Sequence, residues 1–117
     1  TITLDDGSTK DCFVIYSLGN FMSGQTIKNT RNSVILNMNF TKNGETEKTT
    51  IDSVSYIPIY MYKSSSVRTQ RYRVIDIEKT IQNYETGIDT SIGQNMYSTL
   101  KTELSKIKNT MGEHIEF

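Results

Sequence analysis

The chain has 117 residues, of which 35% are hydrophobic and 22% charged, and its 13 Lys and Arg residues balance its 13 Asp and Glu residues. These values indicate one small globular domain or a piece of a larger one, without the net charge that would recruit nucleic acid. The sequence holds no apolar run near the ~20 residues that cross a bilayer, so we expect no transmembrane segment in it.

The first predicted elements are a short hairpin and a buried strand. Residues 1–4 alternate between polar and apolar, and the Asp-Asp-Gly-Ser run at residues 5–8 is typical of a turn. Residues 12–18 are a compact apolar run rich in β-branched and aromatic side chains, which predicts a strand buried on both faces. In such a strand Cys12 would be an inert core thiol. A loop is predicted over residues 21–32.

An alternating pattern predicts a second hairpin. In residues 33–41 every second side chain is apolar, as in a half-buried strand. The Asn43-Gly44 dipeptide follows, and this pair is a strong signal for a two-residue turn because both residues tolerate positive φ. The return strand covers about residues 49–62, where Pro58 predicts either an edge strand or two strands that meet at a kink. A further strand is predicted over residues 71–77.

The last third of the chain has a helical period. Asp76 can cap a helix over residues 77–86, with Gly87 as its stop. Ser91 and Gln94 resemble a capping box that opens a second helix. The apolar side chains of this second helix recur at steps of three and four and form one stripe, which consists of Met96, Leu100, Leu104, Ile107, Met111 and Ile115.

These elements predict an α+β fold, with mainly antiparallel β-strands followed by two C-terminal helices. We expect a single domain over residues 1–117, with a β-rich part at residues 1–77 and a helical part at residues 78–117. No internal repeat divides the sequence.

The single cysteine and the single histidine limit the chemistry of the chain. Cys12 excludes an internal disulfide and a cysteine-based zinc site. His114 has no second histidine beside it, and we expect it in the last turn of a helix, where an imidazolium meets the negative end of the dipole. We therefore expect no catalytic residue, no metal site and no cofactor within these 117 residues.

Charge is unevenly distributed although it sums to zero. Residues 53–75 contain no acid, and their four bases are interleaved with tyrosines. The bases are Lys63, Arg68, Arg71 and Arg73, and the tyrosines are Tyr56, Tyr60, Tyr62 and Tyr72. Such a segment can bind an anionic polymer, or it can be a solvent-exposed basic face without a ligand. The strand period places Arg71 and Arg73 on the same face as Ile75.

Residues 16–21, Tyr-Ser-Leu-Gly-Asn-Phe, give the sharpest local signal. Ser17, Gly19 and Asn20 lie at the C-terminal end of a predicted strand, where the binding sites of layered α/β proteins often lie. We therefore treat these three residues as candidates for the edge of a site. A strand followed by a plain turn would give the same pattern.

Residues 16–21 resemble a hallmark segment of the CapA-type proteins of bacterial capsule and poly-γ-glutamate biosynthesis. Three weaker features of that family follow in the same order: Thr30-Arg31 before a hydrophobic strand, residues 56–60 with their tyrosines and proline, and Tyr72-Arg73-Val74 before a helix. The resemblance covers about residues 2–81.

The resemblance implies a fold like part of the calcineurin-like metallophosphoesterases, in which helices flank a sandwich of two sheets. The candidate metal ligands of that family belong to motifs upstream of the segment matched by residues 16–21, and none of those motifs occurs in this sequence. The chain thus resembles a C-terminal part that is non-catalytic in isolation, and a divalent metal is expected only in the intact parent. Ser17 and Asn20 would then contact the metal ligands of the parent without binding the metal, or lie at the edge of its substrate site.

The resemblance also implies partners and a location. The partners would be the upstream part of the parent and an anionic polymer such as poly-γ-glutamate. The location would be the cell surface or another extracytoplasmic site, with a membrane anchor in the N-terminal part of the parent.

Two other functions stay open. The intact parent could be a metal-dependent hydrolase or transferase to which this chain lends one sheet and the edge of a site. The chain could also be an unrelated β module that binds polyanions. A complete set of metal-ligand motifs upstream would favour the enzyme, and tight polyanion binding by the chain itself would favour the module.

Overall fold

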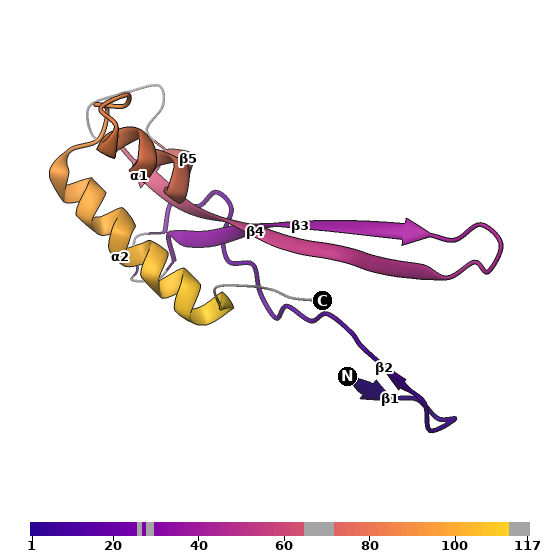
Figure 1. Cartoon of the computed structure of the whole chain (residues 1–117). Coiled ribbons are helices and arrows are strands. Elements are labelled where there is room, and N and C mark those ends of the chain that lie inside the picture. The colour runs from indigo at the N-terminus through magenta and orange to yellow at the C-terminus, as the bar shows by residue number, and fades with distance from the viewer. Residues whose placement is uncertain (26, 28–29, 65–71, 113–117) are drawn as a thin grey trace.

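The computed structural model describes residues 1–25, 27, 30–64 and 72–112. Its elements in chain order are β1 (Ile2–Thr3), β2 (Thr9–Lys10), β3 (Asn32–Lys42), β4 (Thr49–Lys63), β5 (Tyr72–Asp76), α1 (Ile77–Glu85) and α2 (Gln94–Met111). The five strands form two antiparallel sheets and the two helices follow them (Figure 1), which confirms the predicted α+β class.

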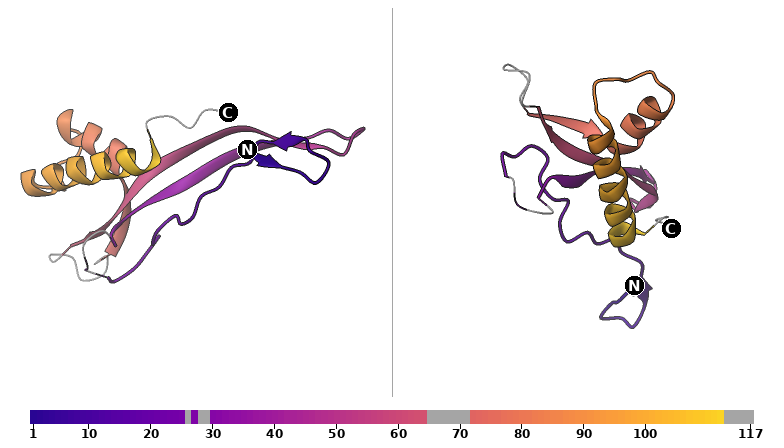
Figure 2. Two further views of the ribbon diagram at one scale, coloured as in Figure 1. Left: turned by 90° about the horizontal axis from the view of Figure 1, so that it is seen from below. Right: turned by 90° about the vertical axis from the view of Figure 1, so that its left-hand side faces the viewer.

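The molecule is elongated. Its radius of gyration is 18.6 Å, and its principal extents are 60 × 30 × 27 Å. A compact domain of this length has a radius of gyration of about 13 Å. The difference arises largely because the far half of the β3–β4 hairpin projects beyond the helices as a two-stranded arm (Figures 1 and 2).

The main sheet has the order β3-β4-β5. β3 pairs with β4 along its whole length, from Asn32 opposite Tyr60 to Lys42 opposite Thr49. β5 pairs only with the last five residues of β4, which leaves the rest of β4 with one neighbour. The sheet therefore has a three-stranded base and a two-stranded arm, and among the described strands β3 has no neighbour on its outer side.

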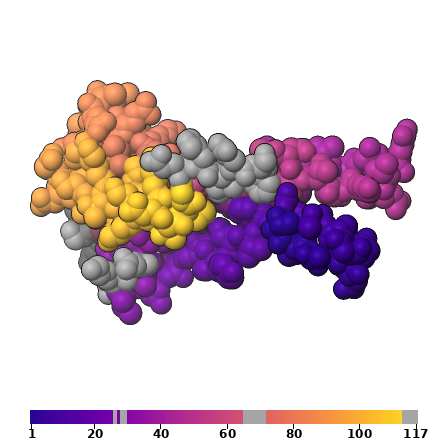
Figure 3. Space-filling model, turned by 60° about the horizontal axis from the view of Figure 1, so that its bottom comes forward, coloured from indigo at the N-terminus to yellow at the C-terminus, as the bar shows by residue number. Residues whose placement is uncertain are grey.

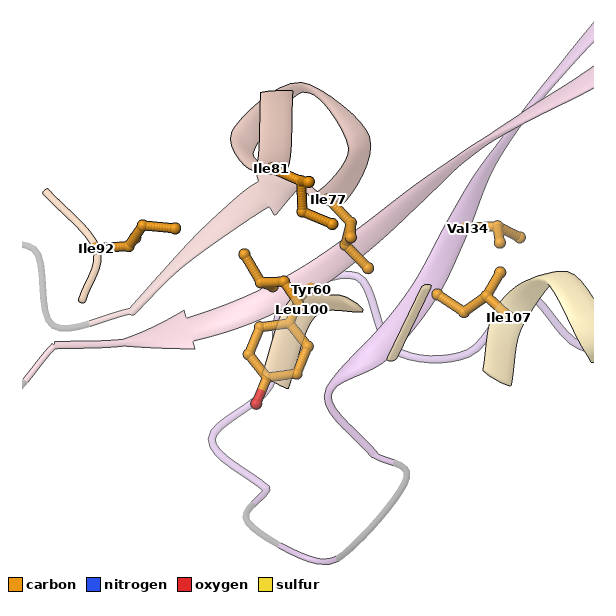
Figure 4. Packing of buried hydrophobic residues seen from close by; sticks show 7 residues of the cluster. All are labelled: Val34, Tyr60, Ile77, Ile81, Ile92, Leu100 and Ile107. Carbon is orange, nitrogen blue, oxygen red and sulfur yellow. The ribbon is translucent and has the colours of Figure 1, made fainter. Parts of the chain in front are cut away.

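Both helices pack on one face of the base (Figure 2). The buried core residues between the sheet and the helices are Val34, Tyr60, Ile77, Ile81, Ile92, Leu100 and Ile107 (Figure 4). Ile77 and Leu100 are fully buried and mark the centre of this core. The predicted stripe of α2 is confirmed for its described residues, since Leu100 and Ile107 are buried in this core and Met96, Leu104 and Met111 are partly buried against it. Ile115 lies outside the described residues. No helix in the described part of the chain is long and apolar enough to cross a membrane.

The ends of α1 follow the sequence prediction. The Asp76 side chain accepts a hydrogen bond from the backbone N–H of Lys79 at 3.0 Å, as an N-cap does. Past the end of the helix, Gly87 takes a φ of 72° and its N–H binds the carbonyl oxygen of Tyr84. Both the cap and the stop are confirmed.

The predicted capping box of α2 is wrong. The helix begins at Gln94 after Gly93, and no side chain caps it. Ser91 and Gln94 have other partners: the Ser91 hydroxyl accepts a hydrogen bond from Arg73 at 3.4 Å, and the Gln94 amide oxygen accepts one from the Tyr84 hydroxyl at 2.8 Å. These tertiary contacts replace the local cap.

The first hairpin and the β3–β4 hairpin are present as predicted, but the second turn is not a two-residue turn. Six residues separate the strands, and the Asn43 side chain accepts hydrogen bonds from the N–H groups of Glu45 and Thr46. The residue with positive φ is Glu47 rather than Gly44. The asparagine therefore organises the turn through its side chain.

Pro58 marks neither an edge strand nor a kink between two strands. β4 is one continuous strand and lies in the middle of the sheet. Pro58 lies opposite Val34, whose N–H points away from β4 towards the carbonyl of Leu18. The proline nitrogen therefore faces the β5 side, and pairing with β5 begins only at Ile59. No ladder hydrogen bond is lost.

The strand predicted at residues 12–18 is wrong. These residues have no strand conformation, Val14 is 67% exposed, Tyr16 is 100% exposed, and Cys12 is an exposed thiol rather than a core one. A strand buried on both faces needs a layer on each side and a paired neighbour. In the described residues both helices lie on one side of the sheet, and the segment meets the edge of β3 at Leu18.

Candidate functional site

A cleft of about 650 Å³ lies between the N-terminal segment, the start of β3 and the end of α2. Its walls are Ser17, Leu18 and Gly19 on one side, the first three residues of β3 at the base, and α2 from Lys106 to Met111 on the other side. Figure 3 shows the end of α2 in yellow on the same face as the purple N-terminal segment. This volume falls in the usual range of ligand pockets, about 300–1,000 Å³.

Hydrogen bonds to one carbonyl oxygen hold residues 17–19 against β3. The Val34 N–H donates to the Leu18 carbonyl oxygen at 3.3 Å, and the Ser33 hydroxyl donates to the same oxygen. Ser33 is buried, so its hydroxyl needs this partner. The wall of the cleft at Leu18 is therefore fixed to the sheet.

Gly19 occupies a position that disfavours a side chain. Its φ is 82°, which residues other than glycine rarely adopt. A Cβ at this position would lie 3.2 Å from both the Asn32 carbonyl oxygen and the Ser33 hydroxyl oxygen. Its N–H also binds the Ser17 hydroxyl oxygen at 3.2 Å. Glycine is thus favoured both by the backbone conformation and by the limited space.

The charges at the cleft are paired. Glu103 accepts a hydrogen bond from the Asn32 amide and forms an ion pair with Lys106, whose Nζ lies 3.1 Å from Oε1. Val34, Ile107 and Met111 add apolar surface to the walls. The cleft is therefore a neutral, mixed polar and apolar environment, suited to an uncharged or weakly charged group.

The structure brings two of the three predicted edge residues to the cleft. Ser17 and Gly19 line it, whereas Asn20 does not. The Asn20 amide nitrogen instead binds the Gln25 side-chain oxygen at 2.6 Å and the Thr30 carbonyl oxygen at 3.5 Å, which ties the following loop together. Sequence reasoning missed the α2 wall, although the helical stripe that carries Ile107 and Met111 indicated which side of α2 faces the sheet.

The two described bases of the predicted basic segment lie on opposite faces of the sheet. Lys63 lies opposite Tyr72, and Arg73 lies opposite Tyr62. Because adjacent residues of a strand point to opposite faces, these two bases are on different sides of the sheet. The remaining two bases, Arg68 and Arg71, lie outside the described residues.

Each described base of this segment rests on a tyrosine. The Lys63 Nζ lies 5.6 Å from the centre of the Tyr72 ring, and the Arg73 Cζ lies 5.0 Å from that of Tyr62. Arg73 shares its face with Ile75, as predicted, and Ile75 packs against the core. The rings occupy part of the surface through which these bases would meet a polymer.

Asp89 partly offsets the charge of Arg73. A hydrogen bond from the Ser91 hydroxyl is the largest cause that lowers the pKa of the Asp89 carboxyl, followed by one from the Ser91 backbone N–H. The positive charge of Arg73 lowers this pKa further by a smaller amount. A carboxylate is thus maintained near Arg73, and it competes with any anionic ligand.

The described residues contain no group of three or more His, Cys, Asp or Glu side chains placed to hold a metal ion. His114 lies outside the described residues. Comparisons with protein-family models, with curated proteins and with solved structures find no significant match to this chain.

Proposed function

We propose that this chain is the C-terminal part of a CapA-type protein of capsule or poly-γ-glutamate biosynthesis and that it is non-catalytic by itself. In this proposal any divalent metal belongs to the upstream part of the parent. The present chain supplies a sheet, two helices and the cleft between the N-terminal segment, β3 and α2. The parent acts at the cell surface or at another extracytoplasmic site.

The observation that carries the proposal is the conformation of Gly19 within the Tyr-Ser-Leu-Gly-Asn-Phe segment. The glycine has positive φ and lies against Asn32 and Ser33, where a Cβ would make unusually close contacts. The Leu18 carbonyl before it is anchored to β3, and Ser17 beside it faces the cleft. The residues that resemble the family's hallmark segment thus have structural roles at the cleft.

The cleft is consistent with a supporting role. Its charged groups are paired with each other, and its hydroxyl groups at Ser17 and Ser33 bind backbone atoms of the chain. Paired charges and hydrogen-bonded hydroxyl groups of this kind hold the walls of the cleft in place, whereas a catalytic centre needs an activated nucleophile or a general base. The reacting groups are therefore expected in the parent.

A chimera tests this function. The C-terminal part of a CapA-type protein is replaced by these 117 residues in a strain that lacks its own copy, and the surface polymer is quantified. We expect polymer production to be restored, and the Gly19→Val chimera to lose it. The Gly44→Val chimera is the matched control, because a Cβ at Gly44 meets no atom within 4 Å.

Immunoblotting establishes that each chimera accumulates. A chimera that accumulates to the parental level but restores no polymer would contradict the proposal. Equal polymer production with Gly19→Val and Gly44→Val would contradict the role given to residues 16–21.

A further inference from the structure

The two-stranded arm formed by the far halves of β3 and β4 has one apolar face. Strand alternation continues the core-facing row of Val34 and Tyr60 outward along both strands. This row, which we call the arm face, consists of Leu36, Met38, Phe40, Ile51, Val54 and Tyr56. Towards the tip, the opposite face of the arm is polar and carries Asn37, Asn39, Ser53 and Ser55. The arm is therefore amphipathic, although it projects beyond the helices (Figure 1).

A two-stranded ribbon with an apolar face is stabilised by a partner that covers this face. An isolated hairpin is at best marginally stable in water, and packing of its apolar face against another element makes it stable. The arm face is buried unevenly, since Val54 is 7% exposed and Phe40 is 59% exposed. Further burial of this face would remove apolar surface from water and so stabilise the arm.

The chain leaves α2 at the arm face. The helix ends at Met111, and Gly112 follows it with a φ of 83°. The Gly112 carbonyl oxygen accepts a hydrogen bond from the Tyr56 hydroxyl at 2.7 Å, and Tyr56 belongs to the arm face. The end of α2 is thus bound where the arm leaves the base of the sheet (Figures 1 and 2).

The next five residues, 113–117, lie outside the described residues, and their sequence fits the arm face. Ile115 and Phe117 are apolar and a polar residue precedes each of them, which is the period of an extended segment with one apolar side. Five extended residues reach about 17 Å. The five steps along β4 from Tyr56 to Ile51 cover about the same distance. The segment is therefore long enough to reach the end of the apolar row.

We propose that residues 113–117 pack as an extended segment on the arm face, from the end of α2 outward. Ile115 then lies beside Val54, and Phe117 lies beside Phe40. The polar side chains of the segment face solvent. This inference is independent of the proposed function.

Packing of this segment has a consequence for the cleft. One wall of the cleft is α2 from Lys106 to Met111, which directly precedes the segment. The opposite wall is fixed to β3 by the hydrogen bond between Val34 and Leu18. A segment that holds the end of α2 against the arm fixes the α2 wall in the same way.

The native chain permits a direct test by NMR. Nuclear Overhauser effects are recorded between the methyl groups of Ile115 and those of the arm. We expect contacts between Ile115 and Val54. Ile57 is the internal control, because it lies on the opposite face of the same strand. Contacts of Ile115 with Ile57 instead of Val54, or with neither residue, would overturn the proposal.

A mixture of isotopically labelled and unlabelled chains identifies which chain supplies the segment. We expect the contacts between Ile115 and Val54 to arise within one chain. Contacts between a labelled and an unlabelled chain would show that the arm face takes a segment of a second copy, and they would overturn the proposal.

Hydrogen exchange measures what the segment does for the arm. Asn37 and Ser55 lie opposite each other across the arm, on a rung where the two residues exchange hydrogen bonds. Ile115→Asp should make their amides exchange about tenfold faster, because an unpaired charge is costly to bury on an apolar face. Glu116→Ala is the matched control and should leave the exchange unchanged, because Glu116 faces solvent in the proposed arrangement. Equal exchange in the two variants would overturn the proposal.

Discussion

The buried hydroxyl of Ser33 donates a hydrogen bond to the carbonyl oxygen of Leu18, fifteen positions earlier in the chain. This contact joins the N-terminal segment to the start of β3 in the main sheet. It also fixes the point where the cleft and the glycine of the hallmark-like segment meet. Loss of the contact would leave a buried hydroxyl without a partner, which costs about 1–3 kcal/mol.

The centre of the core is predicted to depend on Leu100 more than on its neighbour Leu104. Leu100 is fully buried, whereas Leu104 is only partly buried against the same cluster. We expect Leu100→Ala to lower the free energy of unfolding by about 2–5 kcal/mol and Leu104→Ala to lower it by less. Chemical denaturation of both variants measures the difference.

Ile88→Ala is the control for these two changes, since Ile88 is 77% exposed. Its effect should stay within about 0.5 kcal/mol. An effect of Leu100→Ala as small as that of Ile88→Ala would show that α2 does not pack on the sheet as described.

The carboxyl of Asp89 should titrate below its usual pKa of 3.8. Because the pKa is lowered in the folded chain, the associated stability is present above the unfolded value and is lost as the pH falls through the folded value. Removal of the main cause, in Ser91→Ala, should raise this pKa. Arg73→Ala should raise it by less, because the arginine's charge contributes less than the Ser91 hydrogen bonds.

Carbon-detected NMR titration of the Asp89 carboxyl measures both variants. A larger rise in Arg73→Ala than in Ser91→Ala would show that the charge of Arg73, rather than the hydrogen bond from the Ser91 hydroxyl, controls the pKa of this carboxyl.

Poly-γ-glutamate is predicted to bind weakly and only at low salt. Arg68, Arg71 and Arg73 are changed together to alanine, and binding of labelled polymer is followed by fluorescence anisotropy. Exposed ion pairs contribute about 0.2–1 kcal/mol each, so we expect about fivefold weaker binding for the triple variant. The interaction should disappear as ionic strength rises, because exposed charges are screened.

Lys63→Ala is the control for the polymer, since Lys63 lies on the opposite face of the sheet from Arg73. It should change the affinity little. Polymer binding by the triple variant at the parental affinity would remove the basic segment from the proposed function.

The regular elements could be predicted from the sequence because their signals are local. The alternation in β3 and the 3.6-residue period of α2 each define a buried side, and Asp76 and Gly87 mark the ends of α1 by their own conformational preferences. The capping box at Ser91 failed because Arg73 and Tyr84, both distant in sequence, bind its two side chains. A local sequence pattern does not contain information on such partners from other elements.

Only one of the two walls of the cleft could be predicted from the sequence. Ser17 and Gly19 were identified because a strand end with a flexible glycine often borders a site, but the opposite wall depends on how α2 packs over β3. Residues 12–18 show the same limit: an apolar run indicates a preference for burial and does not specify its neighbour.

The measurement that tests the account most directly is the stability of Gly19→Ala, because the cleft and the proposed function both rest on residues 17–19 being held against β3. Gly87→Ala is the matched control: its φ is also positive, at 72°, but a Cβ there meets no atom within 4 Å. Both variants incur the conformational cost of positive φ, about 1–2 kcal/mol, and Gly19→Ala adds an overpacking cost of about 1–3 kcal/mol against Asn32 and Ser33. Chemical denaturation should therefore show Gly19→Ala to be the less stable variant by at least about 1 kcal/mol. Equal stability of the two variants would contradict the anchoring of this segment on the sheet.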